Sequence, residues 1–211
     1  MMRFVPQSPT ELLCLGAHSD DIEIGAGGTV LRLLHEHPTL RVTWVVFSSN
    51  PTREAEARAS AAFFLRGAAG SNVIVKAFRD GFFPAESDEI KQFFESLKNT
   101  TRPDLILTHT RDDAHQDHRT INGLTWNTWR GHTILEYEIP KYDGDLTRPN
   151  VYVPLDAEMV QRKVEGLMTS FPSQAGKHWF DDETFRSVLR LRGVECGARY
   201  AEAFHGRKIC L

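Results

Sequence analysis

LGAHSDDIEIGAGGT, residues 15–29, joins an apolar run to a histidine, two adjacent aspartates and three glycines. An apolar run that ends in polar residues and glycines is typical of a strand that leads into a helix of an α/β sheet. We therefore predict a strand over Leu12–Gly16, a helix over Thr29–His37 and a tight polar turn between them. Such a turn could cradle a phosphate, hold a metal ion or bind nothing.

The alternation of strand and helix continues through the first half of the chain. Strands are predicted over three further runs and helices over two: Arg41–Ser48, Asn72–Phe78 and Asp104–His109 for the strands, Thr52–Leu65 and Ser87–Asn99 for the helices. The strand runs are apolar nearly throughout, which is expected when helices cover both faces of a sheet. The fold class is therefore α/β, with a Rossmann-like, doubly wound, mostly parallel sheet. Ligands of such sheets bind beyond the carboxyl ends of the strands.

The second half is less regular. Strands are predicted over Ile134–Ile139, Val151–Val153 and Ala201–Ile209, and helices over Asp156–Ser170 and Asp182–Gly193. We expect this irregular β/α part to form a wall over the ligand-binding crevice at the carboxyl ends of the strands. Residues 1–211 are expected to form a single domain, because neither a repeat nor a low-complexity linker divides the sequence.

Composition narrows the class of protein. The chain has 211 residues, 41% of them hydrophobic and 25% charged, and a formal net charge of −3. No basic block predicts nucleic acid as a partner, and no apolar run approaches the ~20 residues that span a bilayer. The first ten residues do not resemble a signal peptide, and three cysteines without C-x-x-C spacing indicate neither disulfides nor a thiolate metal site. We expect a cytoplasmic protein with a small-molecule substrate.

A phosphate-binding loop is the weaker interpretation of residues 15–29. The glycines have the spacing G-x-G-G, which is neither G-x-G-x-x-G nor a P-loop. Asp20, Asp21 and Glu23 lie where a phosphate would need positive potential. The glycines are better explained by a tight turn that requires positive φ or a close approach of the backbone.

A metal site explains the polar residues better. His18, Asp20 and Asp21 follow the first strand, and the segment 113–118, Asp-Ala-His-Gln-Asp-His, follows the fourth. Catalytic zinc takes three nitrogen or oxygen ligands and keeps one position open. Either cluster alone could be a helix cap or a solvated loop, but both are expected at the same crevice. Asp112 and Asp113 remain ambiguous between capping and orienting roles.

The two clusters also carry a family resemblance. Residues 17–25 with Gly27-Gly28-Thr29 resemble the A-H-P-D-D-[VI]-E-x-G-x-G-G-T signature of the PIG-L/LmbE-like zinc-dependent de-N-acetylases, and residues 113–118 resemble the D-x-H-x-D-H signature of that family. Arg53-x-x-Glu56-Ala57 and the segment 200–204 also fit. Ser19 departs from the family by replacing its usual proline, which removes no ligand but leaves the loop less rigid.

The resemblance implies a role for each polar residue. His18, Asp21 and His118 are expected to hold zinc or another divalent metal, and Asp20 to act as general base on a water molecule. His115 is expected to stabilise the oxyanion as an imidazolium whose ring is held by Asp117. The implied reaction removes an N-acetyl group from an amino sugar or its glycoside, and the resemblance leaves a homo-oligomer open.

Substrate contacts and two alternatives stay open on the sequence. Arg53 resembles a substrate-binding arginine of the family, and Asp80 could accept hydrogen bonds from sugar hydroxyls. Arg53 is otherwise a solvated residue of a first helical turn, and Asp80-Gly81 simply a turn. Three tryptophans could stack on a sugar or pack at the edge of the core: Trp126, Trp129 and Trp179. The alternative functions are hydrolysis of another N-acyl or carbamoyl group and a non-catalytic module that binds a sugar or nucleotide.

Overall fold

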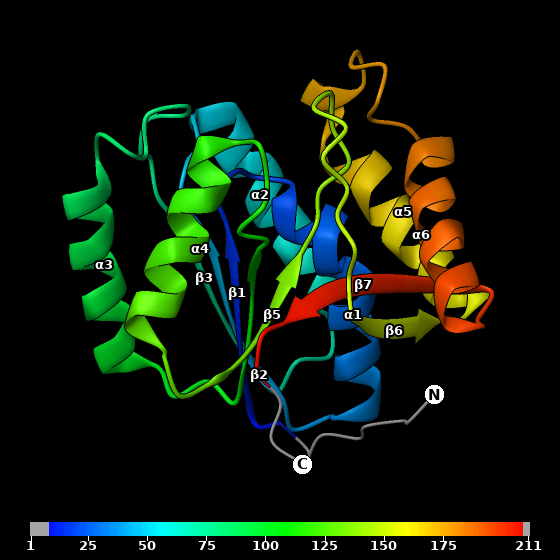
Figure 1. The fold of residues 1–211 in the computed structure, drawn as a ribbon, viewed down its shortest axis with the longest axis horizontal. Helices are drawn as coiled ribbons and strands as arrows, with labels where there is room; N and C mark the ends of the chain where they lie inside the picture. Colours follow the sequence, from blue (N-terminus) through cyan, green and yellow to red (C-terminus); the bar gives the residue numbers. More distant parts are fainter. Residues whose placement is uncertain (1–8, 209–211) are drawn as a thin grey trace.

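The computed structural model describes residues 9–208, which contain a seven-stranded sheet in the order β3-β2-β1-β4-β5-β7-β6 (Figure 1). The strands are β1 (Glu11–Gly16), β2 (Arg41–Val46), β3 (Gly70–Val75), β4 (Leu105–His109), β5 (Thr133–Tyr137), β6 (Val151–Leu155) and β7 (Tyr200–Gly206). The first five pair with one another in parallel, and β7 is antiparallel to both β5 and β6. The predicted mostly parallel α/β sheet is confirmed.

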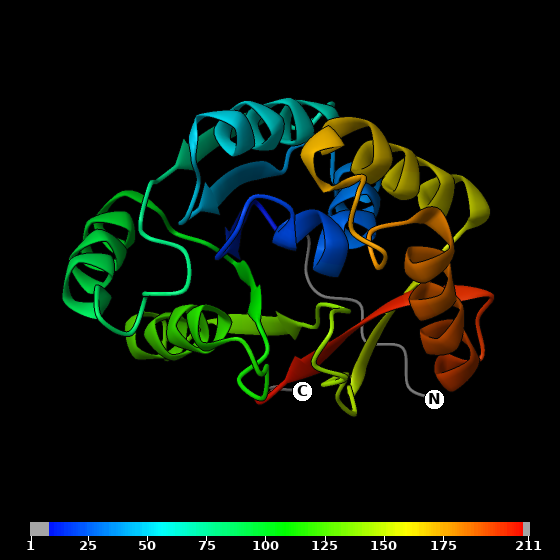
Figure 2. The same cartoon turned by 90° about the horizontal axis from the view of Figure 1, so that it is seen from above.

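Helices cover both faces of this sheet. They are α1 (Asp21–Glu36), α2 (Pro51–Phe64), α3 (Ser87–Thr100), α4 (Gln116–Thr128), α5 (Ala157–Ser170), the short 3-10 helix η1 (Pro172–Gln174) and α6 (Asp182–Cys196). Alternate residues of one strand enter different cores. Leu12 and Cys14 of β1 pack with α1, α2, α5 and α6, whereas Leu13 and Leu15 pack with α3 and α4. Figure 2 shows α2 and α5 on one side of the sheet and α4 on the other.

Helix α1 begins eight residues earlier than the sequence predicted, because the glycines lie inside the helix and not in a turn. None of them has a positive φ. A Cβ on Gly25 would lie 2.2 Å from Cδ2 of Tyr137, and one on Gly28 would lie 2.4 Å from Cδ1 of Leu155. The predicted close approach is confirmed, whereas the predicted turn is wrong.

Other boundaries differ less. Helices α5 and α6 and strand β4 lie within three residues of their predicted bounds. The sequence missed α4, which starts at Gln116 inside the second polar cluster. The last strand ends at Gly206, three residues before its predicted end: Arg207 and Lys208 are not in the strand, and Ile209 lies outside the described residues.

The irregular second half forms the expected wall, which consists of the β5–β6 segment (residues 138–150) and the α5–α6 segment (residues 171–181). Figure 1 shows the segment between β5 and β6 and the segment between α5 and α6 extending beyond the carboxyl ends of the parallel strands. Among the described residues, no helix is long and apolar enough to cross a membrane.

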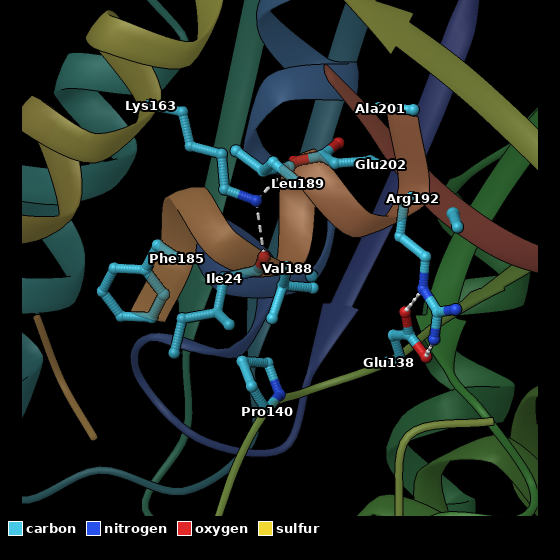
Figure 3. Close-up of a pocket in the computed structure, with 12 residues that line it drawn as sticks. Ile24, Glu138, Pro140, Lys163, Phe185, Val188, Leu189, Arg192, Ala201 and Glu202 are labelled. Atoms are coloured by element: carbon cyan, nitrogen blue, oxygen red, sulfur yellow. Dashed lines mark hydrogen bonds and ion pairs between the residues drawn. The ribbon is translucent and has the colours of Figure 1, made fainter. Parts of the chain in front are cut away.

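A buried ion pair attaches this second half to α1. Lys163 of α5 lies 2.6 Å from Glu202 of β7 and donates to the carbonyl of Ile24 at 2.6 Å (Figure 3). The Glu202 carboxylate accepts from the backbone N–H groups of Gly28 at 2.7 Å and Thr29 at 2.6 Å. Regular α-helical geometry would pair Gly28 N–H with Ile24 C=O. The ion pair therefore serves both of these backbone groups in the middle of α1.

A second ion pair lies beside the first. Arg192 of α6 contacts Glu138, at the start of the β5–β6 segment, at 2.6 and 2.8 Å (Figure 3). The two pairs line a cavity of about 20 Å³, which has room for about one water molecule. The two buried ion pairs therefore connect the second half of the chain to α1 and to the start of the β5–β6 segment.

Candidate metal centre

The two polar clusters meet at the carboxyl ends of β1 and β4. His18 follows β1, Asp20 and Asp21 start α1, and the segment after β4 leads into α4 with His115 and His118. The His18 and His118 rings have centroids 5.2 Å apart although the residues are 100 positions apart in the sequence. The predicted convergence of the two clusters is confirmed.

Three atoms form a nearly equilateral triangle at the centre of the site. His18 Nδ1 lies 3.2 Å from His118 Nε2, and Asp21 Oδ2 lies 3.4 Å from the first and 3.5 Å from the second. Zinc ligands at ~2.0–2.1 Å in tetrahedral geometry are separated by about 3.4 Å. The donor set and its spacing therefore fit a divalent metal ion such as zinc. Overlapping groups that add His115, His109, Asp80 or Asp117 also have metal-ligand spacing.

Carboxylates fix the outer nitrogen of each ligand histidine. Asp113 Oδ2 lies 2.8 Å from His118 Nδ1, and both side chains are buried. His18 Nε2 lies 3.3 Å from Asp117 Oδ2 and 3.1 Å from Asp80 Oδ1. These contacts favour a ring proton on each outer nitrogen and direct the inner nitrogens toward the centre of the triangle, where a metal would bind. Asp113, ambiguous on the sequence, is an orienting carboxylate.

The expected partnership of Asp117 with His115 is not what the structure shows. The Asp117 carboxylate accepts from the backbone N–H of Gly81 at 2.7 Å and of Phe83 at 3.1 Å, besides contacting His18. His115 instead accepts the N–H of Asp117 on its Nδ1, at 3.2 Å, and caps α4. Because Nδ1 accepts a hydrogen bond, the neutral ring of His115 carries its proton on Nε2.

Burial separates the protonation behaviour of the two neighbouring aspartates. Burial alone would raise the pKa of Asp21, but His118, His109 and His18 hold it well below the ordinary value. Burial raises the pKa of Asp20, although Arg53 opposes that rise. Asp21 is thus held in its anionic form, and Asp20 is the more basic carboxylate of the pair.

The ligand histidines are also shifted, in opposite directions. Burial, assisted by His109, lowers the pKa of His118 to about 4. Burial acts in the same sense on His18, but Asp21, Asp117 and Asp80 outweigh it and hold the pKa of His18 well above its ordinary value. Without a metal, His118 therefore offers a free lone pair at neutral pH, whereas the neighbouring carboxylates favour the protonated form of His18.

Arg53 lies at the site and is not a solvated surface residue. Its side chain is 15% exposed, and its guanidinium lies 3.0 Å from Asp20 Oδ2 and 2.8 Å from Glu56 Oε2. It also donates to Ser173 Oγ at 3.3 Å and lies over the Phe171 ring, 5.1 Å from the centroid. Arg53 is therefore anchored between the first cluster and the wall.

Other predicted contacts vary in exposure. Asp80 is 74% exposed beside His18, so it faces the open side of the cluster. Trp129 is buried in the core and Trp126 donates to Glu136 at 2.6 Å, which favours packing over stacking on a substrate.

Ser19, which replaces the usual proline of the family motif, is buried, and its Oγ lies 3.4 Å from Ser49 Oγ.

His109 was not singled out on the sequence. It is fully buried, accepts the N–H of Ala17 on Nε2 at 2.9 Å, and stacks on the His118 ring with centroids 3.9 Å apart. Because its Nε2 accepts from Ala17 and also lies 3.2 Å from Asp21 Oδ2, His109 links the end of β1 to the triangle. The sequence feature that could have identified His109 is its position at the carboxyl end of a predicted strand.

The fold and the triangle define a class: a Rossmann-like α/β protein whose His/Asp cluster at the carboxyl edge of the sheet fits a divalent metal ion. The family model described as PIG-L, GlcNAc-PI de-N-acetylase, matches residues 13–129, more than half of the chain. The protein belongs to the PIG-L family. This membership confirms the predicted enzyme class, a hydrolytic N-deacetylase.

Solved structures share the fold. N,N'-diacetylchitobiose deacetylase from Pyrococcus horikoshii is 18% identical, with a TM-score of 0.70 over 94% of this chain and 84% of that one. A zinc-inhibited teicoplanin deacetylase is 13% identical, with a TM-score of 0.70 over 93% and 97%. GalB, the 4-carboxy-2-hydroxymuconate hydratase from Pseudomonas putida KT2440, is 18% identical, with a TM-score of 0.74 over 96% and 98%.

Proposed function

We propose that the protein is a zinc-dependent hydrolase that removes the N-acetyl group from an N-acetylated amino sugar or its glycoside, releasing acetate and an amine. The observation that carries this proposal is the division between the adjacent aspartates. Asp21 lies in the triangle with His18 and His118, while Asp20 faces Arg53. A protein that merely bound a metal or a sugar would have no use for a basic carboxylate next to a ligand.

The residues around the triangle have complementary roles in the proposed reaction. His18, Asp21 and His118 would hold the zinc, which would polarise the acetamide carbonyl and make a water molecule more acidic. Asp20 accepts the proton of the attacking water and delivers it to the departing nitrogen as the C–N bond breaks. Burial favours this role, because it raises the pKa of Asp20.

His115 supports the carbonyl oxygen as charge develops there. Its ring lies 4.9 Å from the His18 ring and 4.7 Å from the His118 ring, between centroids. Its neutral tautomer presents an N–H donor, so it need not be an imidazolium. Asp117 orients His18, which its carboxylate contacts at 3.3 Å. Arg53 and Asp80 are the proposed contacts for the substrate.

The bond that is cleaved requires a test, because one structural neighbour is named a hydratase and a fold can host several reactions. Zinc-loaded protein is incubated with N-acetylated sugars, glycosides and nucleotide sugars, and with N-formyl and carbamoyl analogues, while acetate and free amine are quantified. We expect acetate and amine in equal amounts from one or more N-acetyl sugars. Release from the other analogues alone would favour the alternative hydrolase, and tight binding without turnover would favour the binding module.

The matched variants are Asp20→Asn and Asp112→Asn. Asp20→Asn should bind zinc normally but lose activity by roughly 10²–10⁴-fold, the usual contribution of a general base. Asp112, 62% exposed on the loop before the second cluster, is the control and should be unaffected when changed. Full activity of zinc-loaded Asp20→Asn would refute the assigned role.

A further inference from the structure

The wall reaches the metal centre through Lys141, a side chain of the β5–β6 segment. Lys141 Nζ lies 3.0 Å from Asp113 Oδ1 and 2.5 Å from Asp145 Oδ2. The Lys141 side chain is 9% exposed, and those of Asp113 and Asp145 are 1% and 13% exposed. A lysine at such a place loses much of its hydration, and its two carboxylate partners compensate for that loss.

Both oxygens of Asp113 are engaged. Oδ2 contacts His118 Nδ1 at 2.8 Å, while Oδ1 accepts the N–H of His115 at 2.8 Å and contacts Lys141. The ammonium and the backbone amide together fix the plane of the carboxylate. That plane determines how the His118 ring turns, and therefore where its Nε2 lone pair points.

Further contacts fix the position of Lys141 and of the β5–β6 segment that carries it. Asp145 binds the ammonium and also accepts the N–H of Ala114, next to Asp113, at 2.7 Å. At the base of the segment, Arg192 binds the Glu138 carboxylate and the carbonyl of Thr147, the latter at 3.1 Å. The position of the ammonium is therefore set by the wall and by the backbone of the second cluster.

We propose that Lys141 is a positioning residue of the metal centre, which holds the Asp113 carboxylate so that His118 presents Nε2 to the metal. This inference rests on the proposed function, because it assumes that His118 is a ligand. The ammonium of Lys141 contacts Asp113 and Asp145 and none of the three triangle residues, so its effect is transmitted through Asp113. The wall over the crevice is thus part of the support of the metal.

The test measures metal binding. The Kd for zinc is determined by competition with a chromophoric chelator, and the visible absorption of the cobalt-substituted protein reports ligand geometry.

The variants are Lys141→Met, Lys141→Arg, Asp113→Asn and the double variant Lys141→Met/Asp113→Asn. The control is Lys177→Met, which lies on the α5–α6 segment of the wall. We expect Lys141→Met to weaken zinc binding by about tenfold, the lower end of the range for groups that orient a ligand. Lys141→Arg should stay within about threefold of wild type because the cation is kept.

Two results would overturn the inference. One is an unchanged zinc Kd and cobalt spectrum in Lys141→Met. The other is the same loss on adding Lys141→Met to Asp113→Asn, because an effect transmitted through Asp113 must shrink in that background. If Lys141→Met does not fold, Asp145→Asn takes its place with the same two criteria. A wild-type chain that does not bind zinc would refute the proposed function itself, so the zinc Kd of the wild type distinguishes the two failures.

Discussion

Replacing Arg53 by glutamine should move the acidic limb of the pH profile of kcat to higher pH. Asp20 must be ionised to accept a proton, and Arg53 lies 3.0 Å from its Oδ2. Burial already raises the pKa of Asp20, and the guanidinium counteracts that rise. Without the cation the pKa of Asp20 rises further, so a larger share of the enzyme is protonated and inactive at mildly acidic pH.

The size of the shift follows from the geometry. At 3.0 Å and an effective dielectric constant of about 20, two unit charges interact with about 5.5 kcal/mol, or about four pKa units. Water that enters the site of the smaller side chain will reduce this value, and carboxylates beside arginine typically shift by about 1–3 units. We therefore expect the acidic limb to move upward by about two units.

The assay is acetate release at saturating substrate over a range of pH, because kcat is insensitive to any loss of substrate binding at Arg53. Arg58→Gln is the matched control, since Arg58 lies on the same helix, is 49% exposed and pairs with Glu54. Its acidic limb should coincide with that of the wild type. An acidic limb that does not move in Arg53→Gln, or moves downward, would refute the role of Asp20 as the base that Arg53 tunes.

Three further outcomes are expected. Gly25→Ala should lower the free energy of unfolding, measured by chemical denaturation, by about 2–3 kcal/mol, because its Cβ would lie 2.2 Å from Tyr137. The control Gly123→Ala should not destabilise the protein, because its Cβ would meet nothing within 4 Å. Lys163→Met should cost about 3–5 kcal/mol in the same experiment, because it leaves a buried carboxylate without its cation; a loss below about 1 kcal/mol would contradict this. Zinc binding at pH 7 should release more protons, by up to about one, from the wild type than from His18→Gln, because the carboxylates beside His18 raise its pKa and a metal would displace its proton. A pH indicator in weak buffer measures the release, and equal release would contradict the displacement of a proton from His18 by the metal.

The sequence predicted the sheet and the meeting of the two clusters because both depend on local patterns. An apolar strand followed by His18 or by the 113–118 segment is visible along the chain, and parallel strands bring their carboxyl ends to one edge. The start of α1 was not predictable in the same way. Gly25 and Gly28 resemble turn residues until Tyr137 and Leu155, more than 100 positions away, are seen to pack against them.

The partners of the site residues were harder to predict than the residues themselves. The family resemblance implied that Asp117 holds the ring of His115, whereas the start of α4 turns the Asp117 carboxylate toward His18. Lys141 lies in a turn-rich segment that gave no sign of a metal centre. Its contact with Asp113 exists only because the wall folds back over the second cluster.

The link between Lys163, Glu202 and the middle of α1 limits how this protein can be re-engineered. The family match ends at residue 129, which suggests a catalytic half to which different walls could be attached. However, both members of the ion pair lie after that boundary, and they bind the carbonyl of Ile24 and the amide of Gly28. A chimaera with a foreign second half would therefore need its own lysine and carboxylate at these two places, or the helix that begins with Asp21 would lose its support just beyond its first turn.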